Sequence, residues 1–494
     1  MSTNLRPHHN GSLAVKPTTF PLDVLLVVFR YLLPMVRKKR WRPITSSVWK
    51  EDELERWSPY GRSKPDLTFT ESLASVCPVW REAMSLIPSF WTRLVIWVGR
   101  QATPLAQVRQ YLAWSRDLPL DIYVLQRPNE SDSDESDNEL KARVKARVDA
   151  VFGLLGAHMK RWRVLRMEVV HSSNIPRPRI DLVGQANILE TLELIFDVDN
   201  SVADTSAGPP TFAQLDTPKL EGLIIGGSHF RELFVASHHR SPMPPLLRDA
   251  GIFNYGSQHP PFHIYDLLSC LARGNLRVLK DVALDNLQLD CSRLPRAGPV
   301  VPHASGYGWY ANVHFTDVPN NVIAEYNSLL GYPYADRIEY TRCLPMARCM
   351  PLADCHEIVL NDIDDPQTIV NLLVPRCDTD ENSTQIAYFY DCDGLLREVF
   401  FVLSLPFLAS DTDEWLCPCL DSLTIVSCTN FTSSELRRFV EARSRAHAAS
   451  GSIENGEGGF VVSPIFELTV RNCCELAEED EQWFEENVTK FSWR

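Results

Sequence analysis

One spacing of apolar residues recurs along this chain and restricts its fold more than any other feature. Aliphatic residues at positions i, i+3 and i+5 are followed by a polar or thiol residue at i+8. Apolar residues two positions apart are typical of a strand with one buried face, and the residue at i+8 falls where such a strand bends away. Two copies fit in full: Leu420, Leu423, Ile425 with Cys428, and Ile465, Leu468, Val470 with Cys473.

Weaker copies of this spacing lie upstream, at uneven intervals. They are Trp91, Leu94, Ile96; Trp162, Leu165, Met167 with Val170; Leu189, Leu192, Leu194 with Asp197; Leu220, Leu223, Ile225 with Ser228; Leu279, Val282, Leu284 with Leu287; and Cys355, Ile358, Leu360 with Ile363. The spacing resembles that of leucine-rich repeats, in which short parallel strands alternate with turns and helices. Thr432 to Glu435 form a capping-box sequence before a helical pattern, so one unit is predicted as strand, turn and helix.

Such a unit cannot bury its apolar face alone, so the units are expected to stack into a curved parallel sheet with helices outside it. The uneven intervals predict an irregular array, closed by the acidic stretch 475–486. An ordinary multi-domain α/β protein is the competing interpretation, because any α/β protein contains apolar strands followed by helices.

The N-terminal part of the chain shows helical spacing instead. From Pro21, apolar residues recur every three or four positions to Leu32, and the same period returns from Leu73 to Ile87. Pro21 and Pro78 each stand where a helix start tolerates a missing N–H. These segments are predicted as short helices.

The two segments together resemble the F-box. Residues 20–32, FPLDVLLVVFRYL, are similar to its opening pattern, residues 73–81, LASVCPVWR, to its second half, and residues 89–91, SFW, to its end. The whole arrangement is similar to the large F-box families of mushroom-forming fungi. The predicted fold class is therefore α/β: an N-terminal helical F-box module followed by an irregular leucine-rich-repeat-like solenoid.

The resemblance implies that the helices dock a Skp-family adaptor and, through it, a cullin. The residues expected to bind the adaptor are Pro21, Leu22, Val24, Leu25, Val28, Phe29, Leu32, Val76, Cys77 and Trp80. So short a segment carries more apolar surface than it can cover by itself, which favours a partner helix in a groove. The alternative is that these side chains close onto the solenoid as a cap.

The domain organisation follows from these patterns. Residues 1–18 are predicted to be a flexible tail, 19–92 an F-box-like domain with an inserted loop at 34–66, and 93–494 the solenoid. An acidic stretch at 128–138 contains no apolar residue, so a flexible loop is expected there, ahead of a helix from Leu140 to Leu155. The loop is interpreted as a solvated linker, with phosphorylation of its serines as the alternative.

The charge and the cysteine content restrict the kinds of partner and the cellular compartment that are expected. With 63 acidic and 49 basic residues the formal charge is -14, which disfavours nucleic acid. Only the run from Arg37 to Arg40 is compactly basic, and a solvated loop is favoured there over a nuclear address. The apolar segment from Val24 to Phe29 is too short to span a membrane, so no membrane partner is expected. Thirteen cysteines in apolar or strand-like contexts favour a reducing compartment, so a cytoplasmic and/or nuclear location is expected.

No catalytic motif is found in the sequence. A nucleophile elbow, a phosphate-binding glycine loop, a dinucleotide fingerprint and a zinc-protease helix are all missing. Spacings such as those of Cys417, Cys419 and Cys473 do not give paired ligand sets, so no metal, cofactor or catalytic residue is predicted. The leading hypothesis is a substrate receptor that presents an unknown target protein to a cullin-RING ubiquitin ligase. A leucine-rich-repeat scaffold without ligase association, and an enzyme with an unfamiliar site, are the alternatives.

Overall fold

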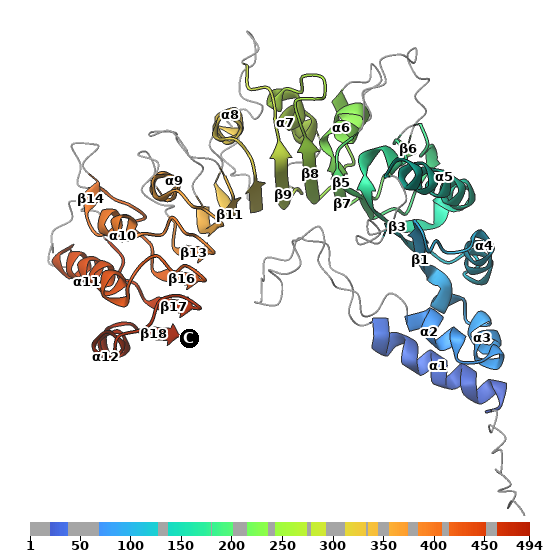
Figure 1. The fold of residues 1–494 in the computed structure, drawn as a ribbon, viewed down its shortest axis with the longest axis horizontal. Helices are drawn as coiled ribbons and strands as arrows, with labels where there is room; N and C mark the ends of the chain where they lie inside the picture. The colour runs from blue at the N-terminus through green and yellow to red at the C-terminus, as the bar shows by residue number, and fades with distance from the viewer. Residues whose placement is uncertain are drawn as a thin grey trace, which may run out of the picture.

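A curved sheet of fourteen parallel strands dominates the protein, and the strands lie side by side in the order in which the chain makes them. The computed structural model describes residues 20–37, 69–126, 137–178, 180–200, 215–235, 243–273, 278–292, 312–331, 334–343, 355–373, 384–407, 414–450 and 462–494. The sheet bends into an arc with its strands on the inner side and most helices on the outer side (Figure 1). The predicted α/β class is confirmed.

The strands are short, with bounds as follows. They are β1 Arg93–Val98, β2 Leu120–Gln126, β3 Trp162–His171, β5 Thr191–Val198, β7 Gly222–Gly226, β8 Asp249–Tyr255, β9 Asp281–Leu287, β10 Asn312–Thr316, β11 Ala335–Thr341, β12 Cys355–Asn361, β13 Ile386–Tyr390, β16 Ser422–Val426, β17 Glu467–Arg471 and β18 Lys490–Trp493. Two small sheets join β4 (Gly184–Gln185) to β6 (Leu215–Asp216) and β14 (Pro406–Phe407) to β15 (Glu414–Trp415).

The helices of the sheet region follow the strands along the outer side of the arc. They are α4 Leu105–Trp114, α5 Asp137–Leu155, α6 Gly227–Phe230, α7 Ile264–Arg273, α8 Asn320–Leu330, α9 Pro366–Leu372, α10 Arg397–Leu403, α11 Ser433–Ser450 and α12 Glu478–Asn487. Single turns occur at η3 (Gly156–Arg161), η4 (Ser172–Asn174) and η5 (Arg231–Val235). No helix within the described ranges is both long and apolar enough to cross a membrane.

Two rows of side chains cross the whole sheet on its core side. In the first row Leu94 pairs with Ile122, Ile122 with Leu165, and the pairing continues strand by strand to Phe491. The second row runs in the same way from Ile96 to Trp493. Because side chains alternate between the two faces of a strand, the residues between and beside these rows face the inner side of the arc.

All eight predicted copies of the apolar spacing fall on strands, namely β1, β3, β5, β7, β9, β12, β16 and β17. Strands β2, β8, β10, β11, β13 and β18 were not predicted. Several of them place an unexpected side chain in a core row, such as Ala250, Tyr340, Ala387 or Trp493. Where such a side chain is small, larger side chains on the neighbouring strands fill the space beside it: Ala387 lies between Ile358 and Leu423.

Thiols occupy the i+8 position of four strands in the C-terminal half. Cys343, Cys392 and Cys473 each donate to a carbonyl of the preceding strand, at 3.5 Å to Phe315, 3.3 Å to Leu360 and 3.7 Å to Ile425. The backbone N–H of Cys392 also donates to the sulfur of Cys428 over 3.3 Å. Burial raises the pKa of Cys343 to about 12, so this thiol stays protonated and acts as a donor. These cysteines join neighbouring strands and are not arranged to hold a metal.

A residue in the left-handed region lies two positions after the second core row in most strands of the second half, at the end of the strand or just past it. The eight residues have φ between 48° and 56° and are Asn254, Asn286, Asp317, Arg342, Asp362, Asp391, Ser427 and Asn472. Asn and Asp adopt this conformation more readily than other non-glycine residues. The same turn is therefore repeated where each strand leaves the sheet.

Helix α11 is fixed by side chains at its start and near its middle. Thr432 and Glu435 form the predicted capping box: the Thr432 N–H donates to Glu435 Oε2 over 2.9 Å, and the Glu435 N–H to Thr432 Oγ1 over 3.3 Å. Further along, the fully buried guanidinium of Arg443 donates to five backbone carbonyls, those of Leu416, Cys417, Pro418, Leu420 and Ser463. The acidic stretch 475–486 enters α12, and β18 follows it as the last strand.

The helices that precede the sheet are α1 (Leu22–Arg37), α2 (Phe69–Ser75), α3 (Pro78–Ser85) and η2 (Pro88–Thr92). Residues 20–37 and 69–92 are called the N-terminal module below. Helix α1 continues to Arg37, past the predicted start of the inserted loop at 34, and the rest of that loop lies outside the described residues, as do 1–18 and 128–136. Helix α5 begins at Asp137, within the predicted acidic loop, and buries Val144, Val148 and Leu155 as expected.

Trp91 joins the N-terminal module to the sheet. Its indole N–H donates to the Met84 carbonyl over 2.9 Å, and its ring lies 4.9 Å from that of Tyr111 and 4.4 Å from that of Trp114. Most of the buried apolar residues form one continuous core from Leu25 in α1 to Val488 near the C-terminus. The two predicted domains thus share a hydrophobic core.

Candidate functional site

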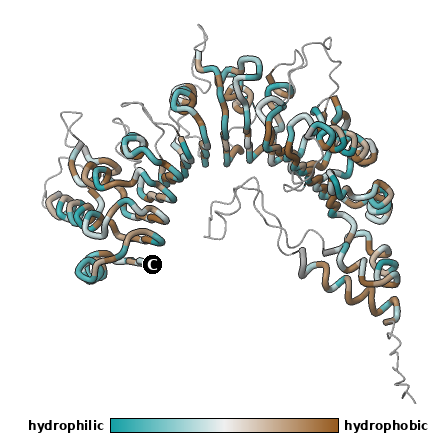
Figure 2. Tube along the Cα trace, viewed as in Figure 1, coloured by the Kyte–Doolittle hydropathy of each residue, from teal (hydrophilic) through white to brown (hydrophobic). Residues whose placement is uncertain are grey.

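Helix α1 is apolar on two opposite faces, and one of them is exposed. Phe20, just before the helix, and Val24, Val27, Val28 and Tyr31 on it are 61%, 41%, 52%, 45% and 75% exposed. These five residues are called the outer stripe. An apolar face of a helix is ordinarily buried, so the outer stripe is a surface without its usual cover. Figure 2 shows α1 as largely hydrophobic, in contrast to α12, which is largely hydrophilic.

The opposite face of α1 forms the core of the N-terminal module. Phe29 is fully buried and its ring packs edge-on against those of Trp80, at 5.2 Å, and Phe90, at 6.1 Å. Leu25 is buried beside it, while Leu32 packs at the edge of the same core. The Arg81 Nε donates to the Ala74 carbonyl over 3.1 Å and so fixes α3 to α2.

The ten residues predicted to bind an adaptor therefore divide into three groups. Pro21, Leu22, Val24, Val28 and Val76 are exposed; Leu32, Cys77 and Trp80 are half-buried; Leu25 and Phe29 are buried. The two buried side chains hold α1 in place and leave contact with a partner to the exposed ones. The resemblance to the F-box missed Phe20, Val27, Tyr31 and Leu86, although a second row of apolar residues along α1 was a sufficient signal for the first three.

Exposed apolar side chains are concentrated in this module. Of the fifteen large hydrophobic residues that are exposed among the described residues, eight belong to it: the five of the outer stripe with Leu22, Val76 and Leu86. The remaining seven are spread over the much longer sheet region. Scattered exposed apolar residues are normal, whereas a concentration marks an interaction surface.

The inner face of the sheet is the second candidate surface, and its first two strands are apolar. Val95, Tyr123 and Leu125 form a small cluster with Trp97, separate from the main core. Beside it Arg163 binds Asp121 through two hydrogen bonds of 2.8 and 2.7 Å. This part of the face is largely closed by its own side chains.

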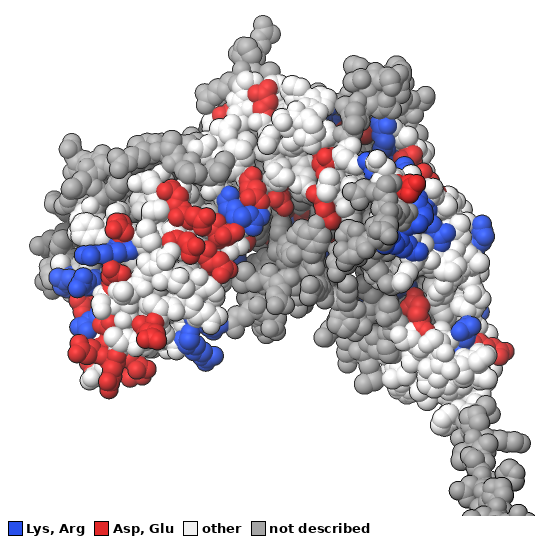
Figure 3. Space-filling view, in the orientation of Figure 1, with Lys and Arg blue, Asp and Glu red and all other residues white. Residues whose placement is uncertain are grey.

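Charged side chains cover the inner face further along. Arg166 lies 2.9 Å from Glu193 and 3.2 Å from Glu168, and burial raises the pKa of Glu193 despite that arginine. Beyond them Arg337 contacts Glu357 at 3.4 Å and Glu339 at 3.7 Å. Figure 3 shows carboxylates gathered along the inner edge of the C-terminal half.

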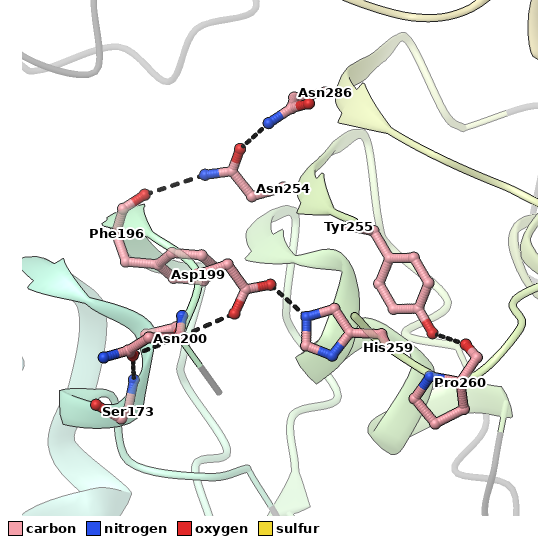
Figure 4. A network of polar contacts seen from close by, with 10 residues as sticks. Ser173, Phe196, Asp199, Asn200, Asn254, Tyr255, His259, Pro260 and Asn286 are labelled. Carbon is pink, nitrogen blue, oxygen red and sulfur yellow. Dashed lines mark hydrogen bonds and ion pairs between the residues drawn. The ribbon is translucent and has the colours of Figure 1, made fainter. Parts of the chain in front are cut away.

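A network of polar side chains at the ends of β5 and β8 is the arrangement closest to a catalytic site (Figure 4). His259 Nε2 lies 2.6 Å from Asp199 Oδ2, and the Ser172 hydroxyl donates to Asp199 Oδ1 over 2.9 Å. A nucleophilic serine needs the imidazole as its immediate base, with the carboxylate behind the imidazole. Here the carboxylate lies between the two, so the contacts tie three segments together and do not activate the hydroxyl.

Among the residues that the structure describes, no group of three or more His, Cys, Asp or Glu side chains is placed to hold a metal ion. His229 lies near Asp199 and His259, and burial lowers its pKa to about 4, so it is neutral at pH 7.

No protein-family model matches this chain, and no curated protein matches it in sequence. The interpretation of its function therefore depends on the two surfaces described above.

Proposed function

We propose that this protein is an F-box-type substrate receptor: the outer stripe of α1 and its neighbours bind a Skp-family adaptor, and the curved sheet presents a target protein to a cullin-RING ubiquitin ligase. The observation that supports this most is the concentration of eight exposed apolar side chains in the N-terminal module. That surface is helical and apolar, and it lies at the end where the sequence resembles the F-box. A partner helix packed along it would bury it as helix-in-groove complexes do.

The sheet region supports the second half of the proposal. Its strand order, its two unbroken core rows and the thiols at i+8 agree with an irregular leucine-rich-repeat-like solenoid. In a solenoid each unit contacts only its neighbours, and the inner face is left to bind an extended partner. The location proposed is cytoplasmic or nuclear, where the eleven free thiols in the described residues would stay reduced.

The alternative is an interaction scaffold whose module no longer binds an adaptor. Leu25 and Phe29, two positions of the F-box resemblance, lie in a core continuous with the sheet, as they would in a simple cap. The exposed outer stripe favours the receptor, because a cap has no need of an apolar outer face.

The test is a binding measurement between the full chain and a purified Skp-family adaptor, with cullin recovery from cells as a second readout. Val24→Asp with Val28→Asp places two charges in the outer stripe without touching the core. Central apolar residues of an interface often contribute about 2 kcal/mol or more each, so we expect the affinity to fall at least about 100-fold. Circular dichroism and the thermal midpoint should match those of the wild type.

Phe401→Asp provides the matched control, since Phe401 is 63% exposed and lies on α10, far along the sheet region. It should bind the adaptor like the wild type. If the wild-type chain binds no adaptor and recovers no cullin, the receptor proposal is wrong. The alternative, an interaction scaffold, would then be favoured.

A further inference from the structure

The exposed apolar residues of α1 have the spacing of a coiled-coil seam. Four residues of the outer stripe follow one another after four, three and four positions: Phe20, Val24, Val27 and Tyr31. This alternation keeps side chains on one line along a helix, where they interlock with the same line on a facing helix. The spacing therefore fits the packing of one further helix along the stripe.

Two opposite charges stand on one edge of this seam. Asp23 directly precedes Val24 and Arg30 directly precedes Tyr31, so the two charges are one heptad apart on the same side of α1. Both side chains are exposed, and neither forms an ion pair among the residues that the structure describes. Charged residues beside an apolar seam set the partner and the orientation of two packed helices. The charged edge of the stripe can therefore select its partner.

The seam is complementary to itself when two copies of α1 run in opposite directions. A two-fold axis through the point between positions 25 and 26 sets Val24 of one copy against Val27 of the other. The same axis sets Phe20 of one copy against Tyr31 of the other. Each contact occurs twice, because the axis repeats it. All four residues of the seam are then covered by the second copy.

The charged edge favours the same arrangement. About this axis Asp23 of one copy lies beside Arg30 of the other, and this contact also occurs twice. In a parallel pair of helices Asp23 would instead lie nearest Val28 of the second copy, and no opposite charges would meet. The antiparallel pair therefore gains two opposite-charge contacts that the parallel pair lacks.

Helix α1 lies at one end of the molecule. Figure 1 shows it at the end of the arc, with α2 and α3 between it and β1. The seam extends from Phe20 to Tyr31, which is about 17 Å along a helix. A contact of this length is smaller than a standard protein interface, so the pair should dissociate readily on dilution.

We infer that two copies of the free chain associate through the outer stripes of their α1 helices, in antiparallel orientation, with Asp23 of each copy beside Arg30 of the other. The inference goes beyond the proposed function, because it concerns the chain without its adaptor. An adaptor and a second copy cannot cover the same side chains at once. The dimer thus keeps the apolar stripe out of water, and an adaptor that binds the stripe separates the two copies.

The mass of the full chain, measured by sedimentation at low ionic strength over about a 100-fold range of concentration, tests the pairing. The wild-type chain should change from monomer to dimer as the concentration rises, with a dissociation constant in the micromolar range. Val24→Asp with Val28→Asp places charges inside the contact and should leave the chain monomeric at every concentration. Phe401→Asp, at an exposed position of α10, should dimerise like the wild type.

Charge exchange at the edge of the seam tests the orientation. Asp23→Arg gives that edge two positive charges in each copy and Arg30→Asp gives it two negative charges, so either variant alone should dimerise about tenfold more weakly. The two variants mixed together should pair with each other. Both exchanges in one chain should restore the wild-type affinity to within about threefold. Glu398→Arg, a reversal at an exposed position of α10, is the matched control and should leave dimerisation unchanged.

Three outcomes would overturn the inference. A wild-type chain that stays monomeric at every concentration forms no such dimer. A dimer that persists in Val24→Asp with Val28→Asp would place the interface elsewhere. Recovery neither in the mixture nor in the double exchange would exclude the contact between Asp23 and Arg30.

The dimer and the proposed function fail separately. Sedimentation is measured on the chain alone, whereas adaptor binding is measured at concentrations low enough to keep the chain monomeric. A chain that binds the adaptor but never dimerises would retain the receptor and reject the dimer. A chain that dimerises through α1 but binds no adaptor would retain the dimer and reject the receptor.

Discussion

The N-terminal module and the sheet region bury their apolar side chains to different extents. In the sheet region the side chains of both core rows are buried from β1 to β17, and exposed apolar residues are few and scattered. In the N-terminal module the main helix covers one apolar face internally and leaves the other bare. The sheet region thus covers its apolar side chains through its own contacts, whereas the N-terminal module covers only part of them. Under the proposed function a second protein covers the rest. The predictions below test this contrast.

The largest expected effect compares the two faces of α1. Phe29→Ala removes a fully buried ring from the module core and should lower the free energy of unfolding by about 3–5 kcal/mol. Tyr31→Ala, two positions away on the exposed side, should change it by less than about 0.5 kcal/mol. Denaturant unfolding of the isolated chain measures both. Similar losses for the two variants would mean that the outer stripe is covered within the chain itself.

Substitution of Arg443 tests how much a buried side-chain donor to backbone carbonyls stabilises the sheet region. Arg443→Met removes a donor from five carbonyls, of which those of Cys417 and Pro418 keep a backbone N–H, and should destabilise the chain by about 3 kcal/mol or more, at about 1–3 kcal/mol for each group that finds no new partner. Arg443→Lys should recover only part of the loss, because an ammonium lacks the planar fork of donors. Burial lowers the pKa of Arg443 to about 10, so it remains charged at pH 7. Full rescue by lysine would show that charge alone is sufficient.

A smaller expected effect is a loss of stability of the sheet region at acidic pH. The pKa of His229 falls from 6.5 to about 4 on folding, mainly by burial, so the unfolded chain binds a proton more readily between these values. Its contribution to stability is present above pH 6.5 and is lost as the pH falls toward 4, by about 2 kcal/mol at pH 5. His229→Gln should therefore lose less stability than the wild type between pH 7 and pH 5. Parallel pH profiles for the two proteins would contradict this.

Much of the fold was predictable, and the missed strands show where sequence reasoning stops. The aliphatic copies marked eight strands correctly because each keeps Leu, Ile, Val or Met in its core rows. Ala250 and Ala387 fit only because larger neighbours lie across the sheet, and such pairing is invisible until the register is known. The left-handed turn residues were an unused signal: Asn254, Asp317 and Asp391 each lie two positions after the second core-row residue of a missed strand.

The candidate surfaces were predicted less well. Helical spacing correctly identified α1 as amphipathic, yet it selected Leu25 and Phe29, which point inward, together with Val24 and Val28, which point outward. Which apolar face of a helix is covered depends on the elements that pack on it, here α3 and η2. The acidic residues of the inner face were not predicted to meet, since Asp249, Asp281 and Asp285 become neighbours only when β8 and β9 pair in register.

The agreement between strand order and chain order has a consequence for synthesis. As the polypeptide leaves the ribosome, each new strand meets an edge that is already formed, and no strand has to wait for a distant partner that has yet to be translated. The molecule can therefore assemble progressively behind its N-terminal helices. The last strand to emerge, β18, is also the one that ends the row.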